Sequence, residues 1–305
     1  MAEMNPSPPR GVGNSKSIWK FGGLTLPVLA WRVSRSAQKN EILERASGLA
    51  FDFLFALFPL LFVLLAVFNL FASHSLQLRT SLLAYFSDFL PPLAFELLNR
   101  TTAELAANRS GERLTIGILV GLWLASGGVA SIISSLNAAF HVEESRSWFK
   151  VRAIALALTL LLSILLLSAL GIILVSGSFV DWLGQQLQLA SAMVFFWKAL
   201  QWPTAVLFVI FSYALIYTFG PNLPEVRWHW ITPGSVFAAV LWLGVSTGFR
   251  IYLQFVNNYT VIFGSLGAAA ILLVWLYVTG LAFLIGGEIN ASIERAAMGG
   301  PERIP

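Results

Sequence analysis

Cysteine is absent from this chain of 305 residues, and charged residues are scarce. The lack of cysteine excludes disulfides, thiolate nucleophiles and thiolate-based metal sites, so the redox compartment cannot be inferred. Asp, Glu, Lys and Arg make up 11% of the residues, whereas a soluble domain carries about a quarter. Because 57% of the residues are hydrophobic and the mean hydropathy is +0.76, this deficit indicates a membrane protein.

Several signatures of soluble enzymes are missing as well. The sequence contains no GxxxxGK[ST] phosphate loop, no GxGxxG fingerprint and no HExxH pair. The three histidines, His74, His141 and His229, fall in three different predicted connections and lack metal-ligand spacing. We therefore expect no enzyme activity, no catalytic residues, no metal and no cofactor.

Long apolar runs dominate what is present. Six of them reach the roughly 20 residues that a transmembrane helix needs. They lie at 49–71, 115–140, 153–177, 199–219, 231–253 and 261–287. An apolar segment in lipid must satisfy its own backbone hydrogen bonds, so these runs predict helices. The predicted fold is an all-α integral membrane protein with a six-helix transmembrane domain over 41–294.

The remaining segments are predicted to be tails and amphipathic connections. Residues 1–40 form an N-terminal tail whose stretch 18–40 fits either a helix on the membrane surface or a plain basic leader. Residues 295–305 form a short second tail. The long connections 72–114 and 178–198 show apolar residues at helical spacing, which predicts amphipathic helices on the outer side.

The distribution of Lys and Arg predicts the orientation. With a cytoplasmic N-terminus, the tails and the second and fourth connections hold 13 of these residues, and the other side holds 6. The positive-inside rule then places both termini in the cytoplasm. Since insertion topology explains the positive charge, we expect no nucleic-acid partner.

Polar residues in or beside the spans are candidates for a transport path. They are Asp52, Asn137, Arg146, Lys150, Arg152, Arg250, Glu288 and Asn290. An ionisable residue inside a bilayer is usually functional or paired, yet a carboxylate near a helix start is also favoured by the helix dipole. Both interpretations stay open for Asp52, which the topology places near the cytoplasmic face with Asn137, Arg152 or Glu288.

Small residues and one proline are candidates for helix packing or hinges. The spacing GxxxG occurs in the second and fifth spans and lets helices approach closely in lipid. The predicted packing positions are Pro59, Gly117, Gly121, Gly244, Gly248, Gly264 and Gly267.

Three stretches together resemble the YihY/BrkB family of bacterial inner-membrane proteins. They are RASGLAFDFLFALFPLL at 45–61, WLASGGVASIISSLNAAFHVEESRSWFKVR at 123–152, and 230–294 with its PG, FGSLGA, WLY and GGEINA motifs. The resemblance covers about residues 40–295. It implies six helices in a bacterial inner membrane with cytoplasmic ends. It also makes Asp52 a poor family-wide functional group, because relatives more often carry a neutral or aromatic residue there.

The resemblance leaves three functional hypotheses. The first is a transporter or flippase-like protein for a lipid, a lipid-linked molecule or a small amphipathic solute, attracted as an anion by Arg146, Lys150 and Arg152. The second is a non-transporting scaffold for envelope integrity or virulence. The third is the ribonuclease BN activity attributed to some members, which we do not expect, since no cluster of metal-binding side chains is evident. Membrane lipids are the expected partners, and a homo-oligomer stays open.

Overall fold

The structure, a computed structural model, describes residues 18–56, 111–175, 191–224, 230–255 and 259–297. Every regular element in these ranges is a helix, and none of them contains a strand. The elements are η1 (Ile18–Gly23), α1 (Leu26–Lys39), a helix over 42–56, α5 (Gly111–Phe140), α6 (Trp148–Val175), α8 (Ser191–Phe219), α9 (Pro233–Phe255) and α10 (Tyr259–Ala297). The predicted all-α class is confirmed for this part of the chain.

Five of the described helices are long and apolar enough to cross a membrane. These segments are Leu119–Phe140, Trp148–Ala169, Phe195–Phe219, Pro233–Tyr252 and Ala269–Ala297. They coincide with five of the six predicted spans. The first predicted span, 49–71, is described only up to residue 56, where it is helical. Residues 72–110 and 178–190 of the predicted outer segments lie outside the described residues, as do the tail residues 1–17 and 298–305.

Three helix ends differ from the predicted boundaries. Residues 191–198, predicted to end an amphipathic connection, form the first turns of α8, and Pro203 lies inside that helix. Transmembrane helices tolerate proline because neighbouring groups satisfy the freed carbonyl. α6 begins at Trp148, so Lys150 and Arg152 lie in its first turns and not in a loop. α10 runs past residue 287 to Ala297, because polar residues end the apolar run without ending the helix.

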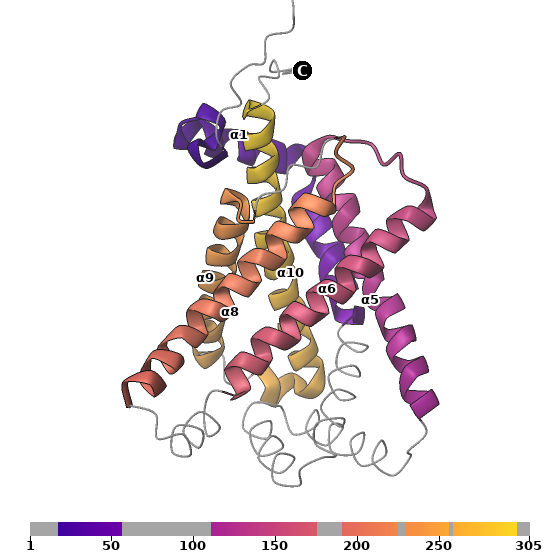
Figure 1. The fold of residues 1–305 in the computed structure, drawn as a ribbon, viewed down its shortest axis with the longest axis vertical. Coiled ribbons are helices and arrows are strands. Elements are labelled where there is room, and N and C mark those ends of the chain that lie inside the picture. Colours follow the sequence, from indigo (N-terminus) through magenta and orange to yellow (C-terminus); the bar gives the residue numbers. More distant parts are fainter. Residues whose placement is uncertain (1–17, 57–110, 176–190, 225–229, 256–258, 298–305) are drawn as a thin grey trace, which may run out of the picture.

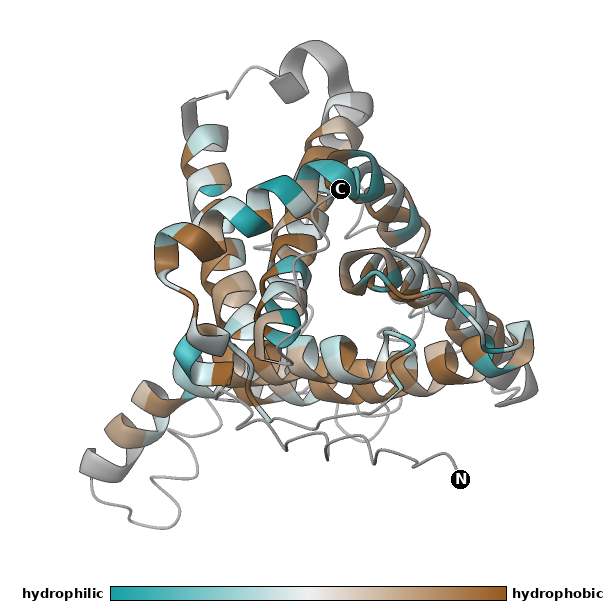
Figure 2. Ribbon diagram, turned by 90° about the horizontal axis from the view of Figure 1, so that it is seen from above, coloured by the Kyte–Doolittle hydropathy of each residue, from teal (hydrophilic) through white to brown (hydrophobic). Residues whose placement is uncertain are grey.

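The long helices pack in a closed circuit. α5 contacts α6, α6 contacts α8, α8 contacts α9, α9 contacts α10, and α10 returns to α5 (Figures 1 and 2). The helix over 42–56 lies against this circuit, since a Cβ added at Gly280 of α10 would be 3.4 Å from the Cβ of Leu49. The N-terminal half of that helix therefore packs directly on the C-terminal half of α10.

One end of the bundle gathers both ends of the described chain. At this end α1 lies across the tops of the long helices and α10 finishes, as Figure 1 shows. α5 and α8 also end here, and the 42–56 helix, α6 and α9 begin here. We call it the α1 end. The predicted grouping of the tails with the second and fourth connections on one side agrees with this arrangement.

The main hydrophobic core lies in the half of the bundle nearest the α1 end. It joins residues of the 42–56 helix, α5, α8, α9 and α10, with Leu162 of α6 packed against them: Ile42, Ala46, Leu49, Ile132, Leu136, Ile216, Tyr217, Ala238, Phe283 and Leu284. Farther along the helices, large apolar side chains are exposed, including Leu119, Leu200 and Ile251. In a polytopic protein such surfaces face lipid, which is the environment that the sequence predicts for them.

Glycine contacts differ from the predicted pattern. Gly244 and Gly248 lie at no helix contact, because a Cβ at either position would meet nothing within 4 Å. The fifth span's GxxxG therefore does not mark a contact in the described part of the chain. Gly121 and Gly267 are buried. Pro59 and the surroundings of Gly117 and Gly264 lie outside what the structure describes.

The close approach occurs elsewhere, at Gly286 of α10. A Cβ there would lie 2.6 Å from the carbonyl oxygen of Gly234 and 2.6 Å from the Cβ of Ala238, both on α9. It would also lie 2.5 Å from the hydroxyl of Tyr217 on α8. Only glycine lets these three helices meet at this distance. The GG of the GGEINA motif is thus a packing signature of the α1 end.

Candidate functional site

Three polar side chains near the end of α10 each hold a different element at the α1 end. Glu288 binds the end of α1, Asn290 binds the start of α9, and Arg295 binds the end of α5. Their spacing along one helix directs them to different neighbours. The C-terminal turns of α10 therefore form a hub on which the other elements are anchored.

Glu288 is fully buried, and its carboxylate receives the side chain of Asn40. The Asn40 amide nitrogen donates to Glu288 Oε1 at 2.6 Å and to the Ser36 hydroxyl at 3.2 Å. The other oxygen, Oε2, has no hydrogen-bond partner among the described residues. A buried carboxylate is expensive unless it is hydrogen-bonded or near positive charge, and Arg295 and Arg45 supply that charge. Glu288 thus ties α1 to the bundle.

The apolar face of α1 supports the same contact. Leu29 packs with Ile289 and Ile293 of α10 in a small core of their own. η1 lies on α10 as well, because a Cβ at Gly22 would be 2.7 Å from the Ile293 carbonyl oxygen. Ile18, Phe21, Leu24 and Val33 pack against this core, whereas Trp31 faces outward and is 54% exposed. The segment 18–40 is therefore docked and contains the helix α1, and its contact with a membrane surface stays a prediction.

Asn137 and Asn290 hold the two ends of the connection between α8 and α9. The Asn137 carbonyl oxygen accepts the backbone N–H of Asn222 at 2.7 Å. The Asn290 carbonyl oxygen accepts the backbone N–H of Gly234 at 2.9 Å, and its amide donates to the Thr232 hydroxyl at 2.9 Å. Both asparagines, predicted as transport-path residues, thus satisfy backbone groups that end or begin helices.

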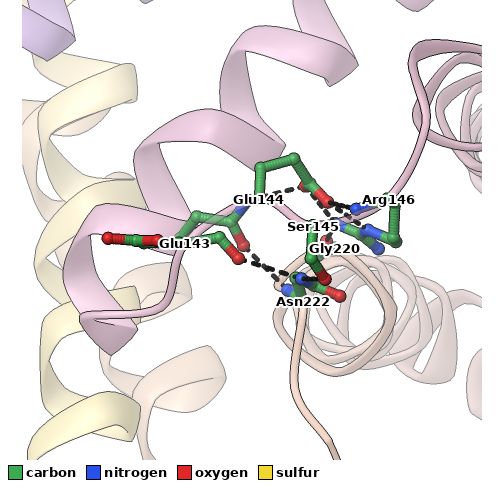
Figure 3. Close-up of polar contacts among 7 residues, drawn as sticks. Glu143, Glu144, Ser145, Arg146, Gly220 and Asn222 are labelled. Carbon is green, nitrogen blue, oxygen red and sulfur yellow. Dashed lines mark hydrogen bonds and ion pairs between the residues drawn. The ribbon is translucent and has the colours of Figure 1, made fainter.

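A second cluster pins the α5–α6 connection to the same α8–α9 connection (Figure 3). Glu144 accepts Arg146 Nε at 2.7 Å and Arg146 Nη2 at 2.6 Å, and the Asn137 amide donates to it at 2.8 Å. Arg146 also donates to the Gly220 carbonyl at 2.9 Å, across the two connections. Hydrogen bonds from Arg146 lower the pKa of Glu144 to about 2. Arg146 is therefore a paired, mostly buried clamp and not a free cation.

Arg295 links α10 to the end of α5 and to His141. Its Nη1 donates to the Ala139 carbonyl at 2.8 Å and lies 3.2 Å from His141 Nδ1. An arginine can only donate, so the contact requires a neutral imidazole with an unprotonated Nδ1. The pKa of His141 is lowered by partial burial, then by the charges of Arg295 and Lys39. His141 is thus a neutral acceptor at the α5–α10 junction.

Arg152 forms a different kind of site where α6 crosses α5. Its guanidinium lies 4.2 Å from the centre of the Trp123 ring, and Nη2 donates to the Trp123 carbonyl at 2.5 Å. The Trp148 ring lies 6.3 Å from that of Trp123. Lys150, two residues before Arg152 on α6, is exposed. No carboxylate in the described part of the chain pairs with either cation.

Two predicted site residues stand apart from these clusters. Asp52 is half-buried on the 42–56 helix and packs against α5, 3.8 Å from the place of a Cβ on Gly128. No hydrogen bond among the described residues joins it to Asn137, Arg152 or Glu288, although Arg152 lies against the adjacent Gly127, 3.9 Å from the place of a Cβ there. The predicted grouping of Asp52 with Arg152 stays a prediction. Arg250 is exposed near the far end of α9 and belongs to neither cluster.

Several contributors were not predicted. Asn40, Glu144 and Asn222 carry the contacts above, and the sequence marks them only as polar residues just beyond helix ends.

A further pattern, GVSTG at 244–248, matches the GxSxG spacing of a hydrolase elbow. In the structure it lies inside the continuous helix α9, where Ser246 accepts the Trp275 indole N–H at 3.3 Å, and not on a strand-to-helix turn. Among the described residues, no three His, Asp or Glu side chains are placed to hold a metal ion.

The chain matches the family described as "Virulence factor BrkB" over residues 33–303. It is similar to YfkH of Bacillus subtilis (strain 168), whose name calls it ribonuclease-like, with 33% identity over 258 residues, 84% of this chain and 91% of the relative. It is also similar to the UPF0761 membrane proteins of Tolumonas auensis (27% identity, 85% of each chain) and Pseudoalteromonas translucida (24% identity, 84% and 82%). No solved structure matches the chain.

Proposed function

Because the chain belongs to the BrkB family and is a multi-pass helical membrane protein, we propose that it moves an amphipathic molecule across the bilayer. The substrate class is a lipid, a lipid-linked molecule or a small amphipathic solute with an anionic head group. The observation that carries the proposal is the closed circuit of five long apolar helices with most described cations collected at one end. A basic rim of this kind attracts anionic head groups to the entrance of a helix bundle.

The same charge distribution supports a cytoplasmic α1 end. The described cations at that end are Lys20, Arg32, Arg35, Lys39, Arg45, Arg146, Lys150, Arg152 and Arg295. The described cations toward the opposite end are Arg113, Lys198 and Arg250. Positive residues are retained on the cytoplasmic side during insertion, so we place the protein in the bacterial inner membrane with both termini inside.

Reconstitution tests the proposal. Purified protein in vesicles that contain fluorescent phosphatidylglycerol, phosphatidylcholine or a lipid-linked sugar should accelerate transbilayer movement of at least one of them, measured by dithionite quenching. Protein-free vesicles and vesicles with an unrelated polytopic protein are the controls. The chain has no cysteine, so a single introduced cysteine is the one position that a thiol label can modify. Labelling such cysteines from each side of the vesicle verifies insertion. Rates that equal both controls across the panel would contradict the proposal.

A scaffold function is the second candidate, and one feature favours it. η1 and α1 expose Trp19, Leu26 and Trp31 at the surface while their other face is fixed to α10. A rigidly held apolar strip is suited to a partner protein. If replacing Trp19 and Trp31 by serine abolishes capture of a defined partner while vesicle assays stay silent, the scaffold explains the family better than transport.

We also propose that the chain is not a nuclease, although one relative's name calls it ribonuclease-like. Metal-assisted phosphodiester hydrolysis relies on clustered carboxylates or histidines, and the sequence patterns give no such cluster. Pure protein, free of soluble nucleases, should leave a tRNA precursor intact in the presence of Mg²⁺ or Zn²⁺. Cleavage that co-purifies with the protein through two different affinity tags would refute this.

A further inference from the structure

Among the described residues, no carboxylate forms an ion pair with Lys150 or Arg152, and Trp123 and Trp148 lie beside Arg152 where α6 crosses α5. Arg152 donates to one backbone carbonyl and stacks on Trp123, and its Nε has no hydrogen-bond partner among the described residues. Arg146, by contrast, is neutralised by Glu144. A partly buried cation beside apolar groups is costly unless an anion compensates it. Asp52 packs on α5 at Gly128, next to the place of Arg152 at Gly127, and no ion pair joins the two side chains. An anion from outside the described residues can therefore compensate Arg152.

The aromatic residues at the start of α6, beside Arg152, are of the kind that line the lipid head-group region. Trp148 and Phe149 are 62% and 78% exposed at the start of α6, with their rings 5.1 Å apart. Tryptophan concentrates at the interface between hydrocarbon and water, where its ring is apolar and its N–H is solvated. An anion that reaches Arg152 at this depth would be the phosphate of a membrane lipid.

α5 offers an apolar strip on the face that carries Trp123. Leu119, Val120 and Leu124 are exposed beside it at helical spacing, with Leu119 and Val120 one turn farther from the α1 end than Trp123. An acyl chain lying along this strip would place its phosphate at the crossing. The apolar strip, the aromatic residues Trp148 and Phe149, and the cation at the crossing thus match the acyl chain, the interfacial region and the phosphate of a phospholipid.

We propose that the α5–α6 crossing binds an anionic phospholipid, with its phosphate on the Arg152 guanidinium and one acyl chain along Leu119, Val120 and Leu124. This rests on the proposed function, and it names the head-group chemistry that the proposed function requires. Guanidinium is the preferred protein group for phosphate because its parallel N–H donors match the oxygens. With Lys150 also on the first turns of α6 and no pairing carboxylate among the described residues, the site favours a lipid of net negative charge over a zwitterionic one.

The test measures local lipid composition with one probe. Phe149→Cys carries an environment-sensitive fluorophore, and vesicles of phosphatidylcholine contain a small fraction of spin-labelled phosphatidylglycerol or spin-labelled phosphatidylcholine. We expect the phosphatidylglycerol quencher to be more effective by about fivefold, Arg152→Gln to remove most of that preference, and Lys150→Gln to remove a smaller part of it. Arg152→Lys should retain it, which separates lost charge from misfolding. The matched control probe, Val240→Cys on α9, is also exposed and should show no preference.

Equal quenching by both lipids in the unmodified site would overturn the inference, as would a preference that survives Arg152→Gln combined with Lys150→Gln. Arg35 is an exposed cation on α1. If Arg35→Gln removes as much of the preference for phosphatidylglycerol, the inference is also overturned, because all the cations of the α1 end would then attract the lipid together. Quenching reports binding and not movement. A protein with the preference and no transport supports this inference and contradicts the proposed function, and a protein that transports without the preference does the reverse.

Discussion

Asn137 is a buried amide that serves two connections at once. Its carbonyl oxygen accepts the N–H of Asn222, and its amide nitrogen donates to Glu144. The side chain is 5% exposed, so water cannot replace these bonds. Its position in the last turn of α5 therefore fixes how the α8–α9 connection meets the α5–α6 connection.

Asn137→Ala should destabilise the α1 end by about 1–3 kcal/mol, because it leaves the Asn222 N–H unpaired in a buried place. Thermal unfolding in detergent should show a lower midpoint. Ser145→Ala is the matched control in the same connection, since Ser145 is exposed and loses only one contact to Asn222. A midpoint for Asn137→Ala that equals that of the control would show that the Asn137 amide does not stabilise the α1 end.

His141 predicts a pH dependence. Its pKa is lower in the folded protein than the ordinary 6.5, so the unfolded chain binds more protons as the pH falls. Stability contributed by neutral His141 is present above pH 6.5 and should be lost as the pH falls below it. Glu144 does not interfere in this window, because its stabilisation is lost only between 4.5 and about 2.

The measurement for His141 is the thermal midpoint between pH 7.5 and 5.5. His141→Asn is the control, because asparagine also tolerates the left-handed backbone at this position, where φ is 55°. The variant's midpoint should vary less with pH than that of the unmodified protein. Identical pH profiles would mean that the imidazole beside Arg295 does not titrate with folding.

The sequence identifies these residues but not their partners. Asn137, Glu288 and Asn290 are polar residues at the ends of apolar runs, and topology brings them to one end of the bundle, as predicted. The partners Asn40, Asn222 and Thr232 come from connections whose positions depend on which helices are neighbours in space. The hydropathy pattern does not show which helices are neighbours in space. The same reason explains Asp52, whose helix packs on Gly128 and not beside Glu288.

At the scale of elements, α10 is the helix on which the others depend. It touches α9 closely at Gly286 and Gly234, and it meets α1 and α5 through its polar C-terminal turns. Its apolar length was evident from the sequence, whereas its extension to Ala297 was not. Residues such as Glu288 and Asn290 end a hydropathy signal, yet they stay helical because the neighbouring elements satisfy them.

Gly286→Ala should loosen the α9–α10 contact. The new Cβ would meet the Ala238 Cβ and the Gly234 carbonyl oxygen at 2.6 Å, and neither can rotate away. Overpacking of this kind costs about 1–3 kcal/mol. Gly244→Ala on α9 meets nothing within 4 Å and should be neutral or stabilising by up to about 1 kcal/mol. Gly244→Ala should therefore resist unfolding in SDS better than Gly286→Ala, and the reverse order would refute the close contact between α9 and α10 at Gly286.

The attachment of α1 gives a second element-scale prediction. Asn40→Ala removes the bond to Glu288 and should release α1 from α10 in part. Leu29, 6% exposed at that contact, reports the release when it is replaced by cysteine. Maleimide labelling of Leu29→Cys should be faster with Asn40→Ala than without it. Unchanged labelling would show that apolar contacts alone hold α1.

At the scale of the whole molecule, the hydropathy of the sequence predicts five of the described helices, their alternation and the side on which charge collects. It does not predict the closed circuit from α5 to α10, because apolar faces in lipid give no signal of which helix they meet. The circuit and its basic α1 end are the features on which the transport proposal depends.

Transbilayer movement of fluorescent phosphatidylglycerol tests that proposal most directly. Vesicles that contain the unmodified protein should expose inner-leaflet label to dithionite, and Arg152→Gln should slow this exposure while phosphatidylcholine moves less in both. Protection of the inner-leaflet label equal to that in protein-free vesicles, with correct insertion shown by cysteine labelling, would contradict a transport function for this family member.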